Sequence, residues 1–449
     1  MNEMFLKNKI GETGAGIVRK LRTAGFAAYF VGGAVRDMLL GKMPQDIDIV
    51  TSALPEQTAE LFPNNQQVGA CFGIILVVEN GINFEVATFR EERNYLDGRH
   101  PESVKYTDNP EIDVLRRDFT INGMLYDPLT GEIIDYVGGR NDLAAGILRT
   151  IGEAELRFNE DYLRMLRAVR FASRFGFELD DAAFKAISLL KDKIKSLPAE
   201  RIREEFNLML TGPAPASAVR MLYNAGLLEV FLPEVAALAG VQQPEMYHPE
   251  GDVFEHTLLM LEHMAVPGVE LAWSILLHDV GKPETFSIDE NGIEHFYRHE
   301  FTGAELAVQI MERLRFSISA TGTVTEAVKN HMRFAFIDKM RVAKWKRLLA
   351  SPDFSLELEL HRIDCIASNG KLENFVLMLD RINDLRGEIA LPEPLITGKD
   401  LIASGFRPGP LFSEILEQVR DAQLSGEIEN REAALDFVSC KFSVRKKNA

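Results

Sequence analysis

The chain has 449 residues, a formal net charge of −17, and 46% hydrophobic and 26% charged residues. This length allows two to four domains with at least one large core. No apolar run reaches membrane-spanning length, the N-terminus lacks a signal-peptide hydrophobic segment, and the three cysteines form no C-x-x-C pair. We therefore expect a cytoplasmic globular protein with no membrane partner. Because the chain is acidic, a polyanionic ligand would need a local basic stripe, and a small substrate is the competing expectation.

A glycine turn follows the first predicted strand. The apolar run 27–31 predicts this strand, and Gly32 and Gly33 come directly after it. Adjacent glycines allow positive φ and let backbone N–H groups approach a ligand closely. Arg36 lies one helical turn further along, within reach of a phosphate if the segment from residue 35 is helical. The pattern indicates a phosphate-binding turn.

Two carboxylates come next in the chain. Asp46 and Asp48 alternate with two isoleucines, and residues two apart in a strand share a face. Two carboxylates that face a glycine turn suit two divalent metals and a triphosphate. A D-x-D pair alone is also common on half-exposed strands, so the order of the whole set carries the prediction.

A hairpin and a polar segment follow. The Asn-Gly pair at 80–81 predicts a hairpin between apolar strands over 72–78 and 82–89. Glu85, in the second of these strands, is either a third metal ligand beside the two aspartates or a solvent-facing strand residue. The polar residues 90–107 include an Asp-Gly pair and a proline and predict a loop.

A stripe of arginines marks a predicted amphipathic helix. We expect Asn159 to cap this helix, and Asp161, Arg164, Arg167 and Arg170 then recur every three residues along one face. Such a stripe is usually a solvated, salt-bridged surface. It also suits phosphate binding, because a guanidinium contacts a phosphate in bidentate geometry.

The second half is helical by periodicity and holds seven of the nine histidines, between His248 and His331. His278 and Asp279 are adjacent in an apolar segment. Burying both costs free energy unless something is bound, and an imidazole with a carboxylate suits a divalent metal. The alternative is a helical body in which the pair has no metal.

The ordered set of strand, glycine pair, Arg-Asp, helix and D-x-D resembles the signature of the polymerase-beta-like nucleotidyltransferases. Its form, G-G-x-V-R-D…D-x-D, is similar to that of the class II tRNA nucleotidyltransferases, which build the CCA end, and of the related bacterial poly(A) polymerases. The resemblance implies an α+β fold, in which a head with a mixed sheet and helices precedes an all-α neck, HD domain and tail. The expected domains are 1–140 (catalytic head), 141–212 (neck), 213–385 (HD domain) and 386–449 (tail).

The resemblance also implies roles for single residues of the head and neck. Asp46 and Asp48 would hold two Mg²⁺ ions. The run R-R-D-F-T-I-N is similar to a family motif in which Asp118 or Asn122 recognises the sugar. The nucleotide would be positioned by Gly33, Arg36, Arg117, Arg167 and Arg170.

The run E-D-x-x-R resembles the nucleotide-selecting motif of the same family. Asp161 would accept a hydrogen bond from the exocyclic amine of cytosine or adenine, and Arg164 would serve the ring nitrogen, whereas uracil and guanine present the opposite pattern. The implied substrates are CTP, ATP and a tRNA 3′ end. The loop that corresponds to residues 90–107 helps the switch from CTP to ATP in the family.

The histidine pattern of the second half resembles that of the HD-domain phosphohydrolases. This implies a second divalent metal site, of unspecified ion, and hydrolysis of 2′,3′-cyclic phosphates as the activity to test. The matching ligands are His256, His278, Asp279 and Asp364, and His299 and His331 fall where some HD domains place ligands for a second ion.

We therefore predict template-independent addition of CCA to tRNA, together with an HD phosphohydrolase activity. The nearest alternatives are an enzyme that adds only CC or only A and a bacterial poly(A) polymerase. A phosphohydrolase with an RNA-binding head and a nucleotide-sensing regulator are alternatives of other classes. The pair Asp46 and Asp48 argues against a sensor, which needs no catalytic metals. The oligomeric state is left open by the sequence.

Overall fold

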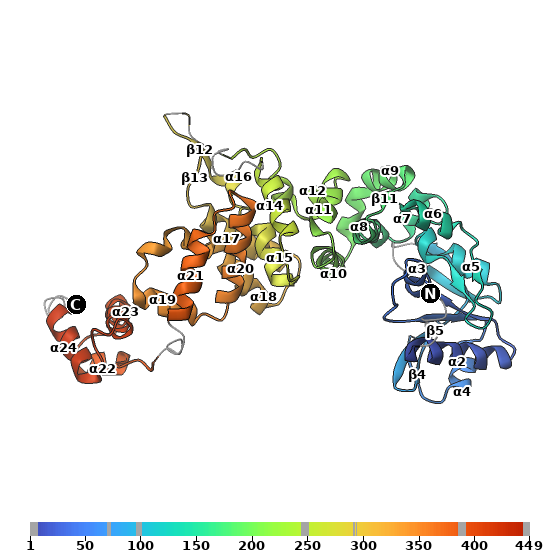
Figure 1. Cartoon of the computed structure of the whole chain (residues 1–449), viewed down its shortest axis with the longest axis horizontal. Coiled ribbons are helices and arrows are strands. Elements are labelled where there is room, and N and C mark those ends of the chain that lie inside the picture. Colours follow the sequence, from blue (N-terminus) through green and yellow to red (C-terminus); the bar gives the residue numbers. More distant parts are fainter. Residues whose placement is uncertain are drawn as a thin grey trace. The chain divides into compact units, whose positions relative to one another are not determined.

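The chain forms two compact units, coloured along the sequence in Figure 1. The computed structural model describes residues 8–69, 73–95, 101–243, 251–290, 292, 294–384 and 392–442. The N-terminal unit comprises Met1–Ala236 with Arg313–Arg315, and the C-terminal unit comprises Ala237–Glu312 with Phe316–Ala449. The boundary expected at residue 212 falls inside the N-terminal unit, and the division into four domains stays a prediction.

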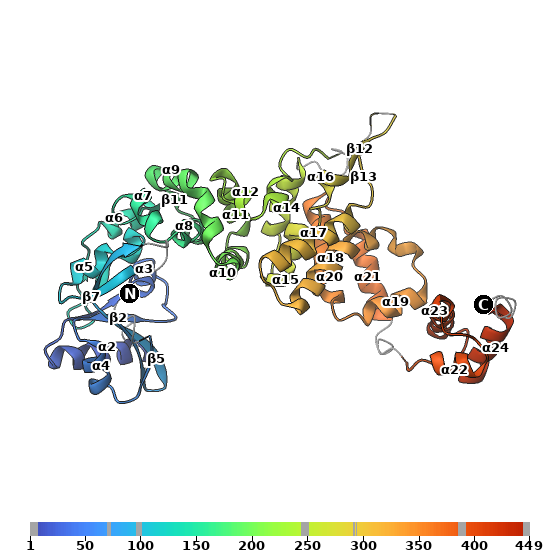
Figure 2. The same ribbon diagram turned by 180° about the vertical axis from the view of Figure 1, so that it is seen from behind.

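A seven-stranded mixed sheet forms the centre of the N-terminal unit, in the order β3-β4-β5-β2-β1-β8-β9. β2 and β5 run parallel, and the other neighbouring pairs are antiparallel. Helices α2 (Lys9–Thr23) and α4 (Pro55–Leu61) pack side by side near β4 and β5 (Figures 1 and 2). The sheet with its helices confirms the predicted α+β class. The strands are β1 (Ala28–Val31), β2 (Asp48–Thr51), β3 (Asn65–Gly69), β4 (Ile74–Glu79), β5 (Ile82–Thr88), β8 (Leu125–Tyr126) and β9 (Ile133–Ile134).

The predicted glycine turn and hairpin are both present. α3 (Gly33–Leu39) begins directly after Gly32, whose φ of +70° lies in the left-handed region that favours glycine. β4 and β5 are joined by Asn80 and Gly81, at φ of +52° and +76°. Two successive positive φ values make the primed turn that an Asn-Gly pair predicts.

Residues 90–107 differ from the expected loop. They form an antiparallel ribbon of β6 (Arg90–Tyr95) and β7 (Pro101–Tyr106), and residues 96–100 lie outside the described residues. Glu91 pairs with Lys105 across the ribbon, and opposite charges at such positions stabilise the pairing. The loop prediction was wrong because polar strands lack the apolar alternation by which strands are recognised.

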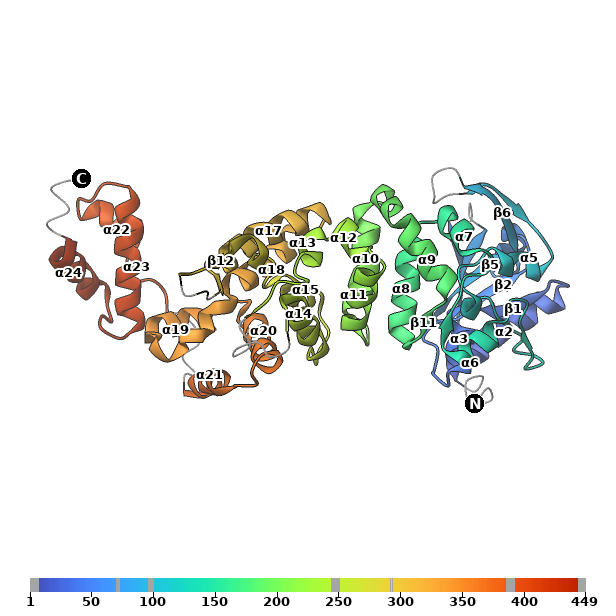
Figure 3. The same cartoon turned by 90° about the horizontal axis from the view of Figure 1, so that it is seen from above.

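The segment after the sheet is helical and centres on α8 (Leu163–Phe175). α8 packs on α10 (Ala199–Leu210) and α11 (Pro215–Asn224), as Figure 3 shows. Leu166 and Val169 of α8 are fully buried, so the apolar positions of the predicted amphipathic helix do face a core. The other elements are α5 (Pro110–Leu115), η2 (Thr120–Asn122), α6 (Gly139–Ala145), β10 (Ile147–Leu148), α7 (Ala154–Glu160), β11 (Glu178–Leu179), α9 (Asp181–Leu190), η3 (Lys191–Ser196), α12 (Leu228–Phe231) and α13 (Pro233–Ala236).

The C-terminal unit is mainly helical, as its periodicity predicts. α14 (Val253–Glu262) and α15 (Val269–Leu277) pack on α20 (Phe354–Ala367), and α18 (Ile318–Asn330) packs on both α15 and α20. Within the described ranges, we find no helix with the length and hydropathy of a membrane span. The other elements are α16 (Lys282–Thr285), β12 (Phe286–Ile288), β13 (Glu294–Phe296), α17 (His299–Arg313), η4 (His331–Lys339), α19 (Val342–Leu349), α21 (Glu373–Asp384), α22 (Gly398–Ala403), α23 (Pro410–Leu424) and α24 (Arg431–Phe442).

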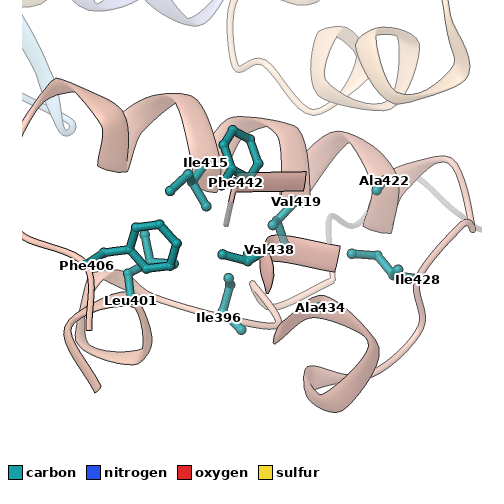
Figure 4. Close-up of a cluster of buried hydrophobic side chains, with 10 residues drawn as sticks. All are labelled: Ile396, Leu401, Phe406, Ile415, Val419, Ala422, Ile428, Ala434, Val438 and Phe442. Carbon is teal, nitrogen blue, oxygen red and sulfur yellow. The ribbon is translucent and has the colours of Figure 1, made fainter. Parts of the chain in front are cut away.

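The last three helices enclose a small apolar core of their own (Figure 4). Leu401 comes from α22, Ile415 and Val419 from α23, and Val438 from α24, and all four side chains are buried. Burial of this shared apolar surface stabilises the three short helices together.

Candidate active site and candidate metal centre

A cavity of about 800 Å³ opens in the N-terminal unit. Its lining holds nine arginine and lysine side chains against five aspartates. The cavity is therefore locally basic although the whole chain carries −17, which is the local surface that a polyanionic ligand needs. Glu85 is not among the lining residues. The predicted site residues that line the cavity are Gly33, Arg36, Asp46, Asp48, Arg117, Asp118, Asn122, Asp161, Arg164, Arg167 and Arg170.

The structure brings the glycine turn and the carboxylate pair together. Asp48 begins β2, and its Cα pairs with that of the last residue of β1, directly before the turn. A Cβ placed on Gly32 would lie 3.9 Å from the Asp48 Oδ2 atom. Asp46 and Asp48 are exposed while Ile47 is buried, so the predicted alternation holds although the strand itself starts only at residue 48.

The carboxylates crowd one another. The parallel register of β2 and β5 pairs Ile49 with Val86, which sets Asp48 beside the exposed Glu85. Asp48 has exposed surface but is partly desolvated by the protein around it, and this desolvation, the Glu85 charge and the Asp46 charge together raise the pKa of Asp48 to about 6. A divalent cation bound between these carboxylates would relieve their mutual repulsion, so their crowding fits a metal site.

The predicted cap of the arginine helix is wrong. Asn159 lies in the last turn of α7, where its side-chain amide donates to the Glu155 carbonyl oxygen at 2.9 Å. The chain breaks after α7, and the Asp161 carboxylate accepts from the Leu163 backbone N–H at 3.0 Å, at the start of α8. The N-cap position of α8 is Tyr162, and Asp161 directly before it lies at the positive end of the helix dipole, which attracts a carboxylate.

Arg164 is held on three sides. Its guanidinium donates to a Glu160 carboxylate oxygen at 2.6 Å and to the backbone carbonyls of Arg157 and Arg116, both at 3.1 Å. The residue is 8% exposed and still lines the cavity beside Asp161. Asp161, the acceptor that the sequence assigned to base selection, and Arg164, the donor, therefore lie in one cavity, and the contacts above hold Arg164 in place.

The other arginines of the stripe have carboxylate partners. Arg167 donates to Asp118 at 2.6 and 3.1 Å, and Arg170 donates to Glu205 at 2.6 Å. Burial lowers the pKa of Arg167, but the Asp118 charge more than offsets this and raises it above its ordinary value. The stripe is therefore both salt-bridged and part of the cavity wall, so the two interpretations of its sequence are compatible.

Arg36 and the residues assigned to sugar recognition are linked to each other. Arg36 donates to Asn122 Oδ1 at 2.7 Å and to Asp37 at 2.9 Å, and the Asn122 amide donates to Asp118 Oδ1 at 3.2 Å. Burial is the largest effect on Arg36 and lowers its pKa. These contacts fix the turn and the R-R-D-F-T-I-N run against each other.

Sequence reasoning missed three basic residues of the cavity wall. Lys42, Arg174 and Arg201 line the cavity, although the sequence assigned none of them to the site. Arg174 follows Arg170 by four residues on α8, and continuing the helical spacing of the stripe by one step could have identified it. Arg201 lies in the run E-R-I-R-E-E-F, which is similar to a short family motif that we expect to support the head, and Lys42 had no such signal.

A second cluster of titratable side chains lies in the C-terminal unit, directly after α15. The Asp279 carboxylate is buried at its centre, with His278 Nε2 at 3.1 Å, His299 Nε2 at 3.2 Å and His331 Nε2 at 3.8 Å. Lys282 Nζ lies 2.7 Å from the same carboxylate. Two sets of three ligand atoms share Asp279, and within each set all atoms lie within 4.8 Å: His256, His278 and Asp279, and Asp279, His299 and His331.

The histidines present their Nε2 atoms to this centre. Three Nδ1 atoms lie 2.6–2.8 Å from backbone carbonyl oxygens, which only accept, so Nδ1 carries the proton and Nε2 keeps a lone pair. The Nε2 atoms of His299 and His331 face each other at 3.1 Å, and burial with the nearby His278 lowers the pKa of His331 to about 3. Two facing lone pairs fit a bound cation. The three pairs are His278 with Ile275, His299 with Phe296, and His331 with Val328.

Asp364, the last predicted ligand, lies beside His256. Its Oδ1 atom is 3.2 Å from His256 Nε2, and neither set of three includes it. Burial raises the pKa of Asp364, but the adjacent His256 outweighs burial and holds it well below the ordinary value. The structure therefore brings all six residues of the predicted HD pattern into one region.

Comparison with known proteins covers nearly the whole chain. The family model described as "Poly A polymerase head domain" matches residues 28–149, and the one described as "Probable RNA and SrmB- binding site of polymerase A" matches residues 176–238. "HD domain" matches residues 253–368, and "tRNA nucleotidyltransferase domain 2 putative" matches residues 353–438. The cavity is lined from the first two regions and their junction, and the histidine cluster lies in the third.

Eight similar curated proteins all carry the name CCA-adding enzyme. The CCA-adding enzyme of Lactobacillus helveticus is 32% identical over 94% of each chain. That of Geobacillus thermodenitrificans is 45% identical over 49% of this chain, and the match spans about half of the relative, 54%. The solved CCA-adding enzyme of Bacillus stearothermophilus in complex with CTP is 30% identical, with a TM-score of 0.72 over 98% of this chain and 100% of that one. The chain belongs to the family of CCA-adding enzymes.

Proposed function

We propose that this protein adds C, C and A in turn to tRNA 3′ ends, from CTP and ATP and without a nucleic acid template. One observation carries the proposal: the carboxylate pair Asp46 and Asp48, the glycine turn, and the pair Asp161 and Arg164 line a single basic cavity. Relatives named CCA-adding enzymes align with nearly the whole chain. A cytoplasmic location, expected from the cysteine usage, is part of the proposal.

Asp46 and Asp48 would hold Mg²⁺, which fits the crowded carboxylates that raise the Asp48 pKa. When bound, the metal supplies a more acidic primer 3′-hydroxyl and charge neutralisation at the triphosphate. The chain itself orients the reactants: the backbone N–H groups at Gly33 approach the phosphates, and Arg117, Arg167 and Arg170 supply guanidinium donors. An arginine has five N–H donors, so pairing with one carboxylate leaves donors for a phosphate.

Base selection follows from the fixed pair at the start of α8. Asp161 Oδ1 accepts from the Leu163 N–H, which leaves Oδ2 to accept the exocyclic amine of cytosine or adenine. Arg164 is held by three acceptors and offers a further N–H to the ring nitrogen. Uracil and guanine place an acceptor opposite Asp161 and a donor opposite Arg164, so each would leave two groups unpaired.

The test offers the protein three tRNA primers, ending before CCA, after C and after CC, with CTP and ATP separately and together. Growth by three nucleotides that then stops is the expected result, and D48N should abolish it. Addition of cytidines only, or of A only to the CC primer, would indicate half of a split pair. Open-ended A addition would indicate a poly(A) polymerase, and no incorporation would refute nucleotidyl transfer.

We propose as a second function that the histidine cluster is a divalent-metal phosphohydrolase site. The observation that favours it is the pair of three-ligand sets that share Asp279, in which the Nε2 atoms converge. Imidazole ligands suit Zn²⁺, Fe²⁺ or Ni²⁺, and the carboxylate of Asp279 also suits Mn²⁺. Hydrolysis of an RNA ending in a 2′,3′-cyclic phosphate should require one of these ions, fail in D279N and persist in D48N. Equal hydrolysis by D279N would refute this function.

A further inference from the structure

Asp113 lies where three parts of the N-terminal unit meet. It is fully buried in α5. Its Oδ1 atom accepts hydrogen bonds from the Arg116 guanidinium at 2.7 and 2.9 Å and from the Arg90 backbone N–H at 3.3 Å. Its Oδ2 atom accepts from Arg117 at 2.8 Å. One carboxylate therefore holds the first residue of the β6–β7 ribbon and both arginines of the R-R-D run.

The two arginines bound to Asp113 lie in the segment that holds α8 in place. The Arg116 carbonyl oxygen accepts from the Arg164 guanidinium at 3.1 Å. Two residues further on, Asp118 accepts from Arg167. The path of the chain through residues 116–118 therefore sets where the base-selecting Arg164 lies.

Asp113 does not line the cavity, so it acts only through the groups it holds. Burial raises its pKa, but Arg117 and Arg116 outweigh burial and hold the pKa below its ordinary value. Asp113 is therefore ionised at neutral pH. Without its charge, the Arg116 and Arg117 guanidinium groups would lose the carboxylate that both of them contact, and the segment that carries the Arg116 carbonyl would shift.

We propose that Asp113 is a positioning residue that sets nucleotide selectivity, by holding the Arg116 carbonyl against Arg164 and joining the β6–β7 ribbon to that contact. The inference deepens the proposed function and rests on it. The same carboxylate also accepts from the Arg90 N–H, so Asp113 ties the first residue of the ribbon to the segment that carries the Arg116 carbonyl. The preference for CTP over UTP therefore depends on this residue.

The test compares D113N with a matched control, D127N. Asp127 is also a buried carboxylate of the N-terminal unit and pairs with Arg22 at 2.9 Å, but it does not line the cavity. The measured quantities are kcat and KM for CTP and UTP on a tRNA that lacks CCA, and for ATP and CTP on a primer that ends in CC. D113N should lower the ratio of kcat/KM for CTP over UTP by about tenfold or more, and D127N should leave this ratio unchanged.

A second variant keeps the proposal testable if D113N does not fold. R116Q keeps the backbone carbonyl but loses the side-chain contact to Asp113. The ratio of kcat/KM for CTP over UTP should therefore also fall in R116Q, but by less than in D113N. An equal loss of activity with all nucleotides, in D113N or in a folded R116Q, would make the contact purely structural and overturn the proposal. Failure of the wild-type protein to incorporate CTP would instead refute the proposed function, so the two failures are distinct.

Discussion

Replacing Asp161 by asparagine should reverse one hydrogen-bonding position of the nucleotide site. Asp161 Oδ1 accepts the Leu163 backbone N–H at 3.0 Å. An asparagine must turn its oxygen toward that same N–H, because its amide group cannot accept. Its NH₂ group then occupies the place of Oδ2 and faces the base. Because the asparagine oxygen keeps the hydrogen bond to the Leu163 N–H, α8 should keep its start.

The magnitude follows from the two hydrogen bonds that change. Cytosine loses a hydrogen bond to a charged acceptor, worth about 1.5–3 kcal/mol. Uracil gains a neutral hydrogen bond to its exocyclic oxygen, worth about 0.5–1.5 kcal/mol. The preference for CTP over UTP should therefore fall by about 2–4.5 kcal/mol, which is roughly 30- to 2,000-fold in the ratio of kcat/KM. Arg164 still opposes the N3–H of uracil, so UTP should remain a slow substrate.

The assay is single-nucleotide extension of a tRNA that lacks CCA, with CTP and UTP offered separately. D180N is the matched control, because the Asp180 carboxylate also accepts the N–H two residues later, from Ala182 at the start of α9, but does not line the cavity. A D161N protein whose preference stays within about threefold of the wild type, while its activity is intact, would refute the assignment of Asp161 to base selection.

Four further predictions concern the charged groups. D48N should lower the rate of nucleotide addition by about 10³-fold or more, because it removes a metal ligand, and an unchanged rate would exclude Asp48 as a ligand. In the presence of a chelator, D48N should also slightly raise the unfolding temperature, because it removes one of the crowded carboxylates. Adding Mn²⁺ or Ni²⁺ to chelator-treated protein should stabilise the C-terminal unit by about 3 kcal/mol at a hundredfold excess over Kd, measured by calorimetry, and D279N should remove this gain but spare CCA addition. E205Q should cost about 3 kcal/mol in urea unfolding, since it leaves the partly buried Arg170, with 11% of its side chain exposed, without its charge partner, whereas D192N, in an exposed ion pair, should leave stability unchanged. Burial raises the pKa of Asp118, but the nearby Arg167 outweighs burial and lowers this pKa below its ordinary value. The ionised Asp118 therefore stabilises the fold at neutral pH, and this stabilisation is lost as the pH falls through the folded-state pKa. The free energies of unfolding of the wild type and D118N should converge at acidic pH.

The sequence predicted what a local pattern can encode. The Asn-Gly hairpin and the glycine turn depend on backbone conformations that few residues adopt. The burial of Leu166 and Val169 depends on helical periodicity. The predictions of a cap at Asn159 and of a loop over 90–107 were wrong because another structure was more stable at each place, and the local sequence pattern does not show it. Residue 159 continues α7 and the break falls at Asp161, whose carboxylate accepts the first N–H of α8, and a polar segment can pair with another polar segment as a ribbon.

The partners of the arginines could not be predicted, because they come from distant parts of the chain. Arg167 and Arg170 pair with Asp118 and Glu205, which lie on other elements. Nine basic side chains around one cavity repel one another, and buried carboxylates at fixed positions offset that repulsion in the free protein. The same carboxylates leave a net positive charge in the cavity, which a triphosphate can neutralise. The salt-bridged stripe and the phosphate site are therefore one structure, and each carboxylate in it sets the direction of a guanidinium before any nucleotide binds.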